Sequence, residues 1–132
     1  MVEKRTDPSQ KNHDKLVAKI AKKRFSYNDR TTHTNPNGEK NYAVDSKYPD
    51  IVAVKSESTP LMGEVETEES VSEEESKQWE SYAALDGAIY LYVPKSKVSE
   101  AKTIIENKGI GITGLRSYEY VDDKLVIKNI EI

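Results

Sequence analysis

The chain contains no cysteine, and it contains no long apolar run. Without cysteine there is no disulfide, no thiolate metal site and no cysteine nucleophile. The first ten residues, MVEKRTDPSQ, lack the apolar core of a secretory signal, and no segment approaches the roughly 18 apolar residues of a membrane-spanning helix. We therefore expect a soluble protein of the cytoplasm, with no membrane partner.

Large apolar aromatic residues are also scarce. The 132 residues include one Trp and one Phe beside eight Tyr, and 36% of them are hydrophobic. This length suits one domain and leaves no room for two ordinary ones. We therefore predict a single domain over residues 1–132, in which the polar stretch 1–9, containing Pro8, is a flexible tail.

Positive charge is almost absent from the middle of the chain. Residues 57–86 carry ten acidic residues against Lys77 alone, whereas residues 1–30 carry nine Lys or Arg against four acidic residues. An acidic middle can hold cations while a basic end faces a polyanion. The alternative is that both stretches are solvated faces of a small domain, and charge alone leaves the two open.

Apolar spacing predicts the elements of the first half. Residues 9–24 repeat apolar side chains at the spacing of one helix face, and residues 25–33 are typical of a strand. The sequence Asn-Pro-Asn-Gly at 35–38 predicts a turn that opens a loop to about residue 48. Two strands follow at 51–54 and 61–67. The first is short and β-branched, as in a strand buried on both faces, and the short connection makes the pair antiparallel.

Helices alternate with strands in the second half. Ser72 and Glu75 form a capping box that begins one helix, in which Trp79 and Tyr82 belong to the apolar stripe. Ser96 caps a second helix. The other predicted boundaries are a helix stop at 86–87, a strand at 88–93, a helix end at 108–109, and strands near 111–120 and 124–131 around a turn at 122–123. The alternation implies right-handed crossovers and a mixed sheet with at least one parallel pair.

Three carboxylates are predicted to meet where two of these strands adjoin. Glu64 and Glu66 lie two residues apart on a strand, so they share a face while Val65 points into the core. Asp50 stands at the start of the neighbouring strand. Carboxylates this close raise at least one pKa unless a cation intervenes, and Mg²⁺ or Mn²⁺ takes such oxygen ligands. We therefore predict a metal site at these three acids.

Each of these acids has a structural alternative. Asp50 can be a turn residue after Pro49, and the two glutamates can lie on the solvated face of an edge strand, because the surrounding sequence is acidic throughout. Against this, Ile51–Val54 has the composition of a central strand, whose paired neighbour should not carry acids without a reason.

The acidic motif resembles that of a known superfamily. Pro49-Asp50, thirteen intervening residues and Glu64-Val65-Glu66 are similar to the PD-(D/E)xK signature of the restriction-endonuclease-like nucleases. The predicted order of helix, three strands, helix and strand also resembles that superfamily's αβββαβ core, followed here by a helix and two further strands. The resemblance implies an α/β fold with a mixed sheet flanked by helices. It also implies a metal-dependent endonuclease that hydrolyses DNA phosphodiester bonds.

The resemblance implies a role for each acid. Asp50 and Glu64 would hold Mg²⁺ or Mn²⁺, and Glu66 would be a further ligand or a general base acting through water. Gln78 would orient a water or contact a phosphate, with an exposed helix position as its alternative. Asp14 stands where relatives often carry a metal-side Glu, and its alternative is a first-turn acid that stabilises the helix dipole.

The chain departs from the superfamily's pattern at Glu66, where Lys is usual. That Lys is thought to polarise the attacking water. Some members with Glu in its place still cut DNA, whereas others that lost the Lys are inactive. Two function classes therefore stay open: an active DNA nuclease, and an inactive nuclease-fold module that binds nucleic acid or protein. Lys77 is either a replacement ammonium or a surface residue.

Two further expectations concern partners and histidines. The expected partner is nucleic acid, DNA in particular, and a homodimer is left open. His13 and His33 are far apart in sequence and lack cysteine partners, so we assign them no metal-binding role.

Overall fold

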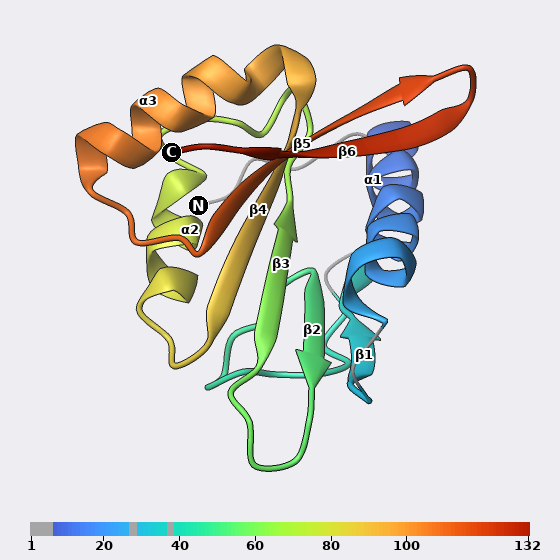
Figure 1. Cartoon of the computed structure of the whole chain (residues 1–132), viewed down its shortest axis with the longest axis vertical. Coiled ribbons are helices and arrows are strands. Elements are labelled where there is room, and N and C mark those ends of the chain that lie inside the picture. The colour runs from blue at the N-terminus through green and yellow to red at the C-terminus, as the bar shows by residue number, and fades with distance from the viewer. Residues whose placement is uncertain (1–6, 27–28, 37–38) are drawn as a thin grey trace.

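A six-stranded mixed sheet separates two layers of helices (Figure 1). The computed structural model describes residues 7–26, 29–36 and 39–132. The strands lie in chain order across the sheet: β1 (Thr31–Thr34), β2 (Ile51–Val54), β3 (Leu61–Val65), β4 (Ala88–Pro94), β5 (Gly114–Val121) and β6 (Lys124–Ile130). The helices are α1 (Asp7–Ile20), continued by the π-helical turn η1 (Ala21–Phe25), α2 (Ser76–Ala83), the 3₁₀ turn η3 (Lys95–Lys97) and α3 (Val98–Lys108).

The connectivity is that of an open α/β sheet. Strands β1, β2 and β3 form an antiparallel meander, β3, β4 and β5 are parallel, and β6 returns antiparallel to β5. Each parallel connection contains a helix, α2 or α3, because neighbouring parallel strands need a crossover. The predicted pairing of 51–54 with 61–67 is confirmed, with Ile51 opposite Gly63 and Ala53 opposite Leu61.

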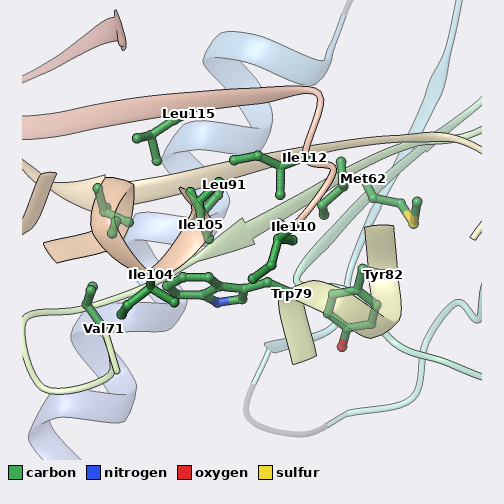
Figure 2. Packing of buried hydrophobic residues seen from close by; sticks show 13 residues of the cluster. Met62, Val71, Trp79, Tyr82, Leu91, Ile104, Ile105, Ile110, Ile112 and Leu115 are labelled. Atoms are coloured by element: carbon green, nitrogen blue, oxygen red, sulfur yellow. The ribbon is translucent and has the colours of Figure 1, made fainter. Parts of the chain in front are cut away.

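Each face of the sheet buries its own apolar cluster. On the side of α2 and α3, Trp79 and Ile104 pack against Leu91 of β4 (Figure 2). On the other side, Val17 of α1 and Phe25 of η1 cover the same strands. Strands β3 and β4 are therefore buried on both faces. A polar side chain on either strand leaves water and needs a partner inside the protein.

The N-terminal elements differ from the expected boundaries. Helix α1 begins at Asp7, within the stretch that the sequence assigns to a tail, while residues 1–6 lie outside the described residues. Pro8 is compatible with this start because the first helical turn has no intrahelical acceptor for its missing N–H. Phe25 lies in η1 instead of a strand, and its ring packs near Tyr92 with ring centroids 6.0 Å apart. The strand begins only at Thr31, and Tyr27 lies outside the described residues.

The two predicted helix starts differ from the observed ones. Helix α2 begins at Ser76 and not near Ser72, although Ser72 Oγ accepts the backbone N–H of Glu75 at 3.2 Å, which is one half of the predicted capping box. Ser96 Oγ donates to Glu68 at 2.7 Å, and η3 precedes α3. The predicted end of α3 is confirmed, because Gly109 adopts the left-handed conformation at φ 63°.

The β5–β6 hairpin reaches across α1 (Figure 1). It turns at Asp122 and Asp123, whose φ values of 50° and 62° match a two-residue hairpin turn, as predicted. Lys19 Nζ lies 3.4 Å from Tyr120 OH, so the hairpin and the helix are in contact. Within the part of the chain that the structure describes, no helix combines the length and apolar character needed to cross a bilayer.

Candidate metal centre

Three buried glutamates face one another between the sheet and α2. Glu64 lies on β3, Glu66 follows the last residue of that strand, and Glu75 immediately precedes α2. One carboxylate oxygen of each lies within 4.8 Å of the others, and the residues are 4%, 1% and 5% exposed. We call these three residues the glutamate cluster. The alternative of a solvated edge strand is wrong, because β3 is an interior strand and both Glu64 and Glu66 are buried.

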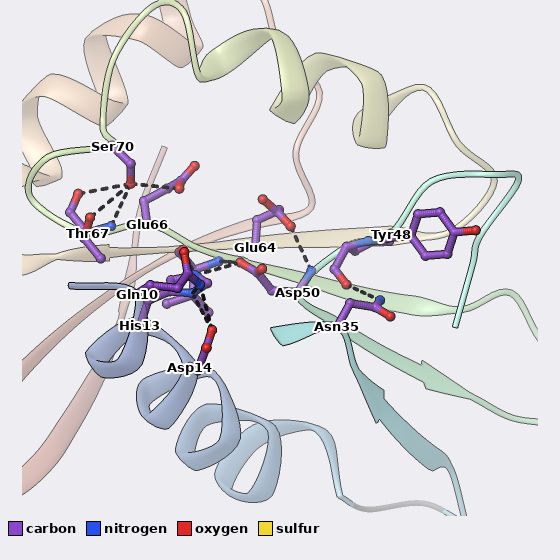
Figure 3. Close-up of polar contacts among 12 residues, drawn as sticks. Gln10, His13, Asp14, Asn35, Tyr48, Asp50, Glu64, Glu66, Thr67 and Ser70 are labelled. Carbon is purple, nitrogen blue, oxygen red and sulfur yellow. Dashed lines mark hydrogen bonds and ion pairs between the residues drawn. The ribbon is translucent and has the colours of Figure 1, made fainter. Parts of the chain in front are cut away.

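The spacing on β3 places two of these acids on one face. Side chains two residues apart on extended backbone point the same way. Glu64 and Glu66 therefore both face α2, whereas Val65 is buried on the opposite face among the side chains of α1, as predicted. Figure 3 shows the two glutamates on one side of the strand and α1 on the other.

Glu66 is held at every polar atom. Trp79 Nε1 donates to its Oε2 at 2.6 Å, and Ser70 Oγ donates to its Oε1 at 3.0 Å. Its backbone N–H donates to Tyr92 O at 2.8 Å, and its carbonyl accepts the Tyr118 hydroxyl at 2.7 Å. The carboxylate therefore has a fixed position, set by α2 on one side and by β4 and β5 on the other.

Asp50 lies beside the glutamate cluster and contacts it through its backbone. Its N–H donates to Glu64 Oε1 at 2.9 Å, while its own Oδ2 accepts the backbone N–H of Val65 at 2.9 Å. The Asp50 carboxylate thus caps the end of β3. The sequence predicts that Asp50 joins Glu64 and Glu66 in the metal site. Among the described residues, the third carboxylate that lies within 4.8 Å of these two belongs to Glu75.

The loop before Asp50 is organised by Asn35, which is 5% exposed. Its side-chain amide donates to Tyr42 O at 3.0 Å and to Pro49 O at 2.6 Å, and its oxygen accepts the backbone N–H groups of Asn41 and Tyr42 at 2.9 Å each. Its backbone N–H donates to Asp50 O at 3.0 Å. The buried side chain of Asn35 therefore joins residues 41 and 42 to Pro49, which directly precedes Asp50.

Burial and mutual repulsion raise the pKa values of the cluster. The pKa of Glu64 is well above its usual range, first because the group is buried and then because Asp50 and Glu66 lie nearby. The pKa of Glu66 is raised to about 8 by burial and then by Glu75, against the opposing hydrogen bond from Trp79. The charged neighbours that dominate both shifts are acidic. The metal-free cluster therefore keeps protons at neutral pH, and a cation would compete with them.

His13 joins α1 to the same end of the sheet. The residue is 2% exposed, and its Nε2 lies 2.9 Å from Val65 O and 3.3 Å from Asp50 Oδ2. Because a carbonyl oxygen only accepts, Nε2 carries the hydrogen. On the other side of the ring, Nδ1 lies 3.4 Å from Asp14 Oδ1, which also accepts the side-chain amide of Gln10 at 2.8 Å (Figure 3).

The structure therefore brings together only part of the predicted ligand set. Glu64 and Glu66 meet as expected, and Asp50 is adjacent to them. Asp14 is separated from these acids, because the His13 ring lies between it and Asp50.

Gln78 and Lys77 are the two polar residues of α2 that the sequence singles out for a role. Gln78 is half-buried next to Trp79, and Lys77 is exposed. In the described part of the chain, no hydrogen bond joins the Gln78 side chain to the glutamates, and Lys77 is not among the charges that dominate their pKa values. The predicted role of Gln78 in catalysis stays a prediction.

Two residues of the site were missed in the sequence. The capping-box interpretation assigns Glu75 to a helix terminus, and the run of acids around it hides any special position. His13 does carry a signal, because it precedes Leu16, Val17 and Ile20 at helical spacing and so continues their apolar stripe by one turn. A histidine in such a stripe is expected to be buried.

Comparison with known proteins does not assign the chain to a family. The chain matches no family model, no curated protein and no solved structure. What is shown is an α/β protein with three α-helices in its described part and an open, six-stranded mixed sheet.

Proposed function

We propose that this protein is a Mg²⁺- or Mn²⁺-dependent nuclease that hydrolyses phosphodiester bonds in DNA. The observation that carries the proposal is the glutamate cluster, in which three buried carboxylates converge within 4.8 Å at the carboxyl end of β3. Burying such acids together destabilises the fold unless they hold protons or bind a cation. Hard oxygen donors are the ligands that Mg²⁺ and Mn²⁺ prefer.

The connectivity supports the nuclease assignment. The order α1, β1, β2, β3, α2, β4 resembles the αβββαβ core of the restriction-endonuclease-like superfamily. Asp50 immediately precedes β2 and Glu64 lies near the end of β3, so the acidic motif falls where two paired strands adjoin. The carboxyl ends of parallel strands are also the usual ligand-binding edge of an open α/β sheet.

The glutamate cluster would hold the ion, with Asp50 as its neighbour. A bound divalent cation would supply positive charge opposite a phosphate and would lower the pKa of water. Both oxygens of Glu66 already accept hydrogen bonds, which favours a ligand role over that of a general base. The usual Lys of the superfamily is absent here, so the metal would have to supply all of the nearby positive charge.

Other residues of the chain orient these acids. Trp79 and Ser70 hold the two oxygens of Glu66, and the Asp50 N–H fixes one oxygen of Glu64. His13 contacts the Asp50 carboxylate from the opposite face of the sheet. Such preorganisation lowers the conformational entropy that ligand binding would otherwise lose.

The test is cleavage of supercoiled plasmid and of branched DNA in the presence of Mg²⁺ or of Mn²⁺. We expect the wild-type protein to cut, and Glu64→Gln to lose activity by about 100-fold or more, as ligand and neighbouring substitutions in metal sites do. Glu106→Gln, which changes an exposed acid on α3, is the matched control and should keep full activity. No cleavage by the wild type with either metal rejects the nuclease assignment.

A second candidate is a catalytically silent module of the same fold that binds nucleic acid. The environment of Glu66 favours it, because the carboxyl group is enclosed by Trp79 and Ser70 and its pKa of about 8 keeps it neutral in the metal-free protein at pH 7. In this case the cluster is a protonated structural element. Calorimetric titration with Mn²⁺ separates the candidates: a bound ion supports the first, and DNA binding without metal binding supports the second.

A further inference from the structure

A groove of about 1130 Å³ opens on the α1 side of the sheet, at the carboxyl ends of the parallel strands. Helix α1 forms one wall. The segments 67–69 and 94–96, which follow β3 and adjoin the end of β4, form another, and residues 118–120 of β5 form the third. Pockets for small ligands are usually about 300–1000 Å³. A groove slightly larger than this range has room for part of a chain-like ligand.

The groove adjoins the candidate metal centre through two of its lining residues. His13 lines the groove and lies 3.3 Å from Asp50 Oδ2. Tyr118 also lines it and donates its hydroxyl to the carbonyl of Glu66 at 2.7 Å. A ligand in the groove would therefore contact His13 and Tyr118, which in turn contact Asp50 and the backbone of Glu66.

The charges along the groove are divided between its walls. Lys15 and Lys19 of α1 line one wall and are exposed. On the other walls, the carboxylate of Glu68 accepts the Ser96 hydroxyl, and that of Glu119 pairs with Lys95 at 3.4 Å. The α1 wall thus presents two exposed ammonium groups that can contact phosphates, while the acids Glu68, Glu69 and Glu119 lie on the other walls.

An aromatic ring stands at the lip of the groove. Tyr120 is 49% exposed, and Lys19 Nζ lies 4.9 Å from its ring centroid, which ties the ring to the α1 wall. An exposed ring beside lysines is a stacking platform for a nucleobase. Bases inside a duplex are already stacked on one another, so the ring can serve only an unpaired base.

We propose that this groove binds a single-stranded segment of DNA, with its phosphates on Lys15 and Lys19 and one base stacked on Tyr120. The assignment rests on the proposed nuclease function and narrows its substrate to DNA that carries unpaired nucleotides next to the bond that is cut. A continuous duplex would leave the ring of Tyr120 without a base.

The experiment measures fluorescence anisotropy of a labelled oligo-dT with the full-length protein in EDTA. We expect Tyr120→Ala to weaken binding by about 5- to 150-fold, the range for one stacked base, and Tyr120→Phe to keep most of the affinity because the ring remains. Lys19→Ala should also weaken binding. Lys55→Ala, an exposed lysine in the β2–β3 connection at the other end of the strands, is the control and should bind as the wild type does.

Three outcomes would overturn the assignment. They are oligo-dT binding unchanged in Tyr120→Ala, a duplex of equal length bound as tightly as oligo-dT, and displacement of oligo-dT by poly-glutamate at equal charge concentration. EDTA removes the metal from this assay, so the groove is tested apart from catalysis. Oligo-dT binding by a wild-type protein that fails to cleave DNA would reject the nuclease and keep the groove. Cleavage of DNA by the wild type, together with unchanged oligo-dT binding by Tyr120→Ala, would keep the nuclease and reject the groove as the binding site.

Discussion

The two sides of the sheet at the end of β3 differ sharply, although neighbouring residues of one segment contribute to both. On the α2 side, the glutamate cluster is enclosed, and Glu66 is 1% exposed beneath Trp79. On the α1 side, Val65 and His13 are equally buried, but a groove opens next to them and is lined by lysines. The α2 side encloses buried carboxyl groups, and the α1 side presents two exposed lysines, Lys15 and Lys19, to water.

The difference shows how one strand can serve two purposes. Alternation along β3 sends its acids to one face and Val65 to the other. The acids are then available to a cation, while the opposite face is available for packing α1, whose outer surface carries the lysines. Asp50 connects the sides, because its backbone contacts Glu64 and its carboxylate lies beside His13. Substitutions that change only the α1 side or only the α2 side test whether the two sides have separate roles.

The largest expected effect is the pH dependence of stability in the metal-free protein. The pKa of Glu66 rises from 4.5 to about 8 on folding, so between these values the folded chain keeps a proton that the unfolded chain releases. The free energy of unfolding should therefore fall as pH rises from 5 to 8, by about 1.4 kcal/mol per pH unit for one proton. Glu64, shifted in the same direction, adds to the fall.

Urea unfolding at a series of pH values in EDTA measures this slope. Saturating Mn²⁺ should reverse much of the fall above pH 7, because the ion replaces the protons and binds only the folded site. Stability that stays level or increases between pH 5 and 8 in EDTA would show that the glutamates are not held as a buried, mutually repelling group.

The next effect isolates Glu66. At pH 8, Glu66→Gln should raise the free energy of unfolding of the metal-free protein by about 1–3 kcal/mol, because a neutral amide replaces a partly ionised buried acid. At pH 5 the gain should disappear, since Glu66 is then protonated and equally neutral. The same substitution should weaken Mn²⁺ binding in calorimetric titrations. Glu106→Gln should change neither quantity, and identical Mn²⁺ isotherms for Glu66→Gln and the wild type would remove this residue from the site.

A smaller effect is expected on the α1 side. His13→Ala removes the hydrogen bond to Val65 O and the contact with Asp50, and should lower the free energy of unfolding by about 1–3 kcal/mol. Its effect on Mn²⁺ affinity should be smaller than that of Glu64→Gln, because His13 contacts only the neighbouring Asp50. A larger loss of metal affinity in His13→Ala than in Glu64→Gln would place the metal on the α1 side and break the division.

The order of the elements and the antiparallel pairing of β2 with β3 could be predicted because their signals are local. The β-branched run Ile51–Val54, the turn at Asp122 and Asp123, and Gly109 after α3 each depend on a few neighbouring residues. Helix starts were harder. Ser72 Oγ accepts the backbone N–H of Glu75 as a cap does, but α2 begins only at Ser76, and Glu75 is also a member of the glutamate cluster. Which contact a side chain makes is decided by the whole fold.

The same distinction separates the predicted part of the site from the missed part. Glu64 and Glu66 share one face through a spacing of two, and Asp50 follows from the short connection between two strands. Glu75 reaches the cluster only when α2 packs on the sheet, and His13 reaches Asp50 only when α1 packs on the other side. Asp14, one residue on from His13, is turned towards Gln10. Along a helix, a shift of one residue rotates a side chain by about 100°.

The smallest expected effect concerns the salt dependence of binding on the α1 side. If Lys15 and Lys19 each neutralise a phosphate of single-stranded DNA, the logarithm of affinity should fall with the logarithm of salt concentration by about 0.7 for each contact. Lys15→Ala with Lys19→Ala should therefore reduce the slope by about 1.4 and leave Mn²⁺ binding in the glutamate cluster unchanged. Anisotropy of oligo-dT at several salt concentrations measures the slope, with Lys55→Ala as the matched control. Equal slopes for the double variant and the wild type would assign these lysines to solubility, and the basic wall would then have no part in recognition.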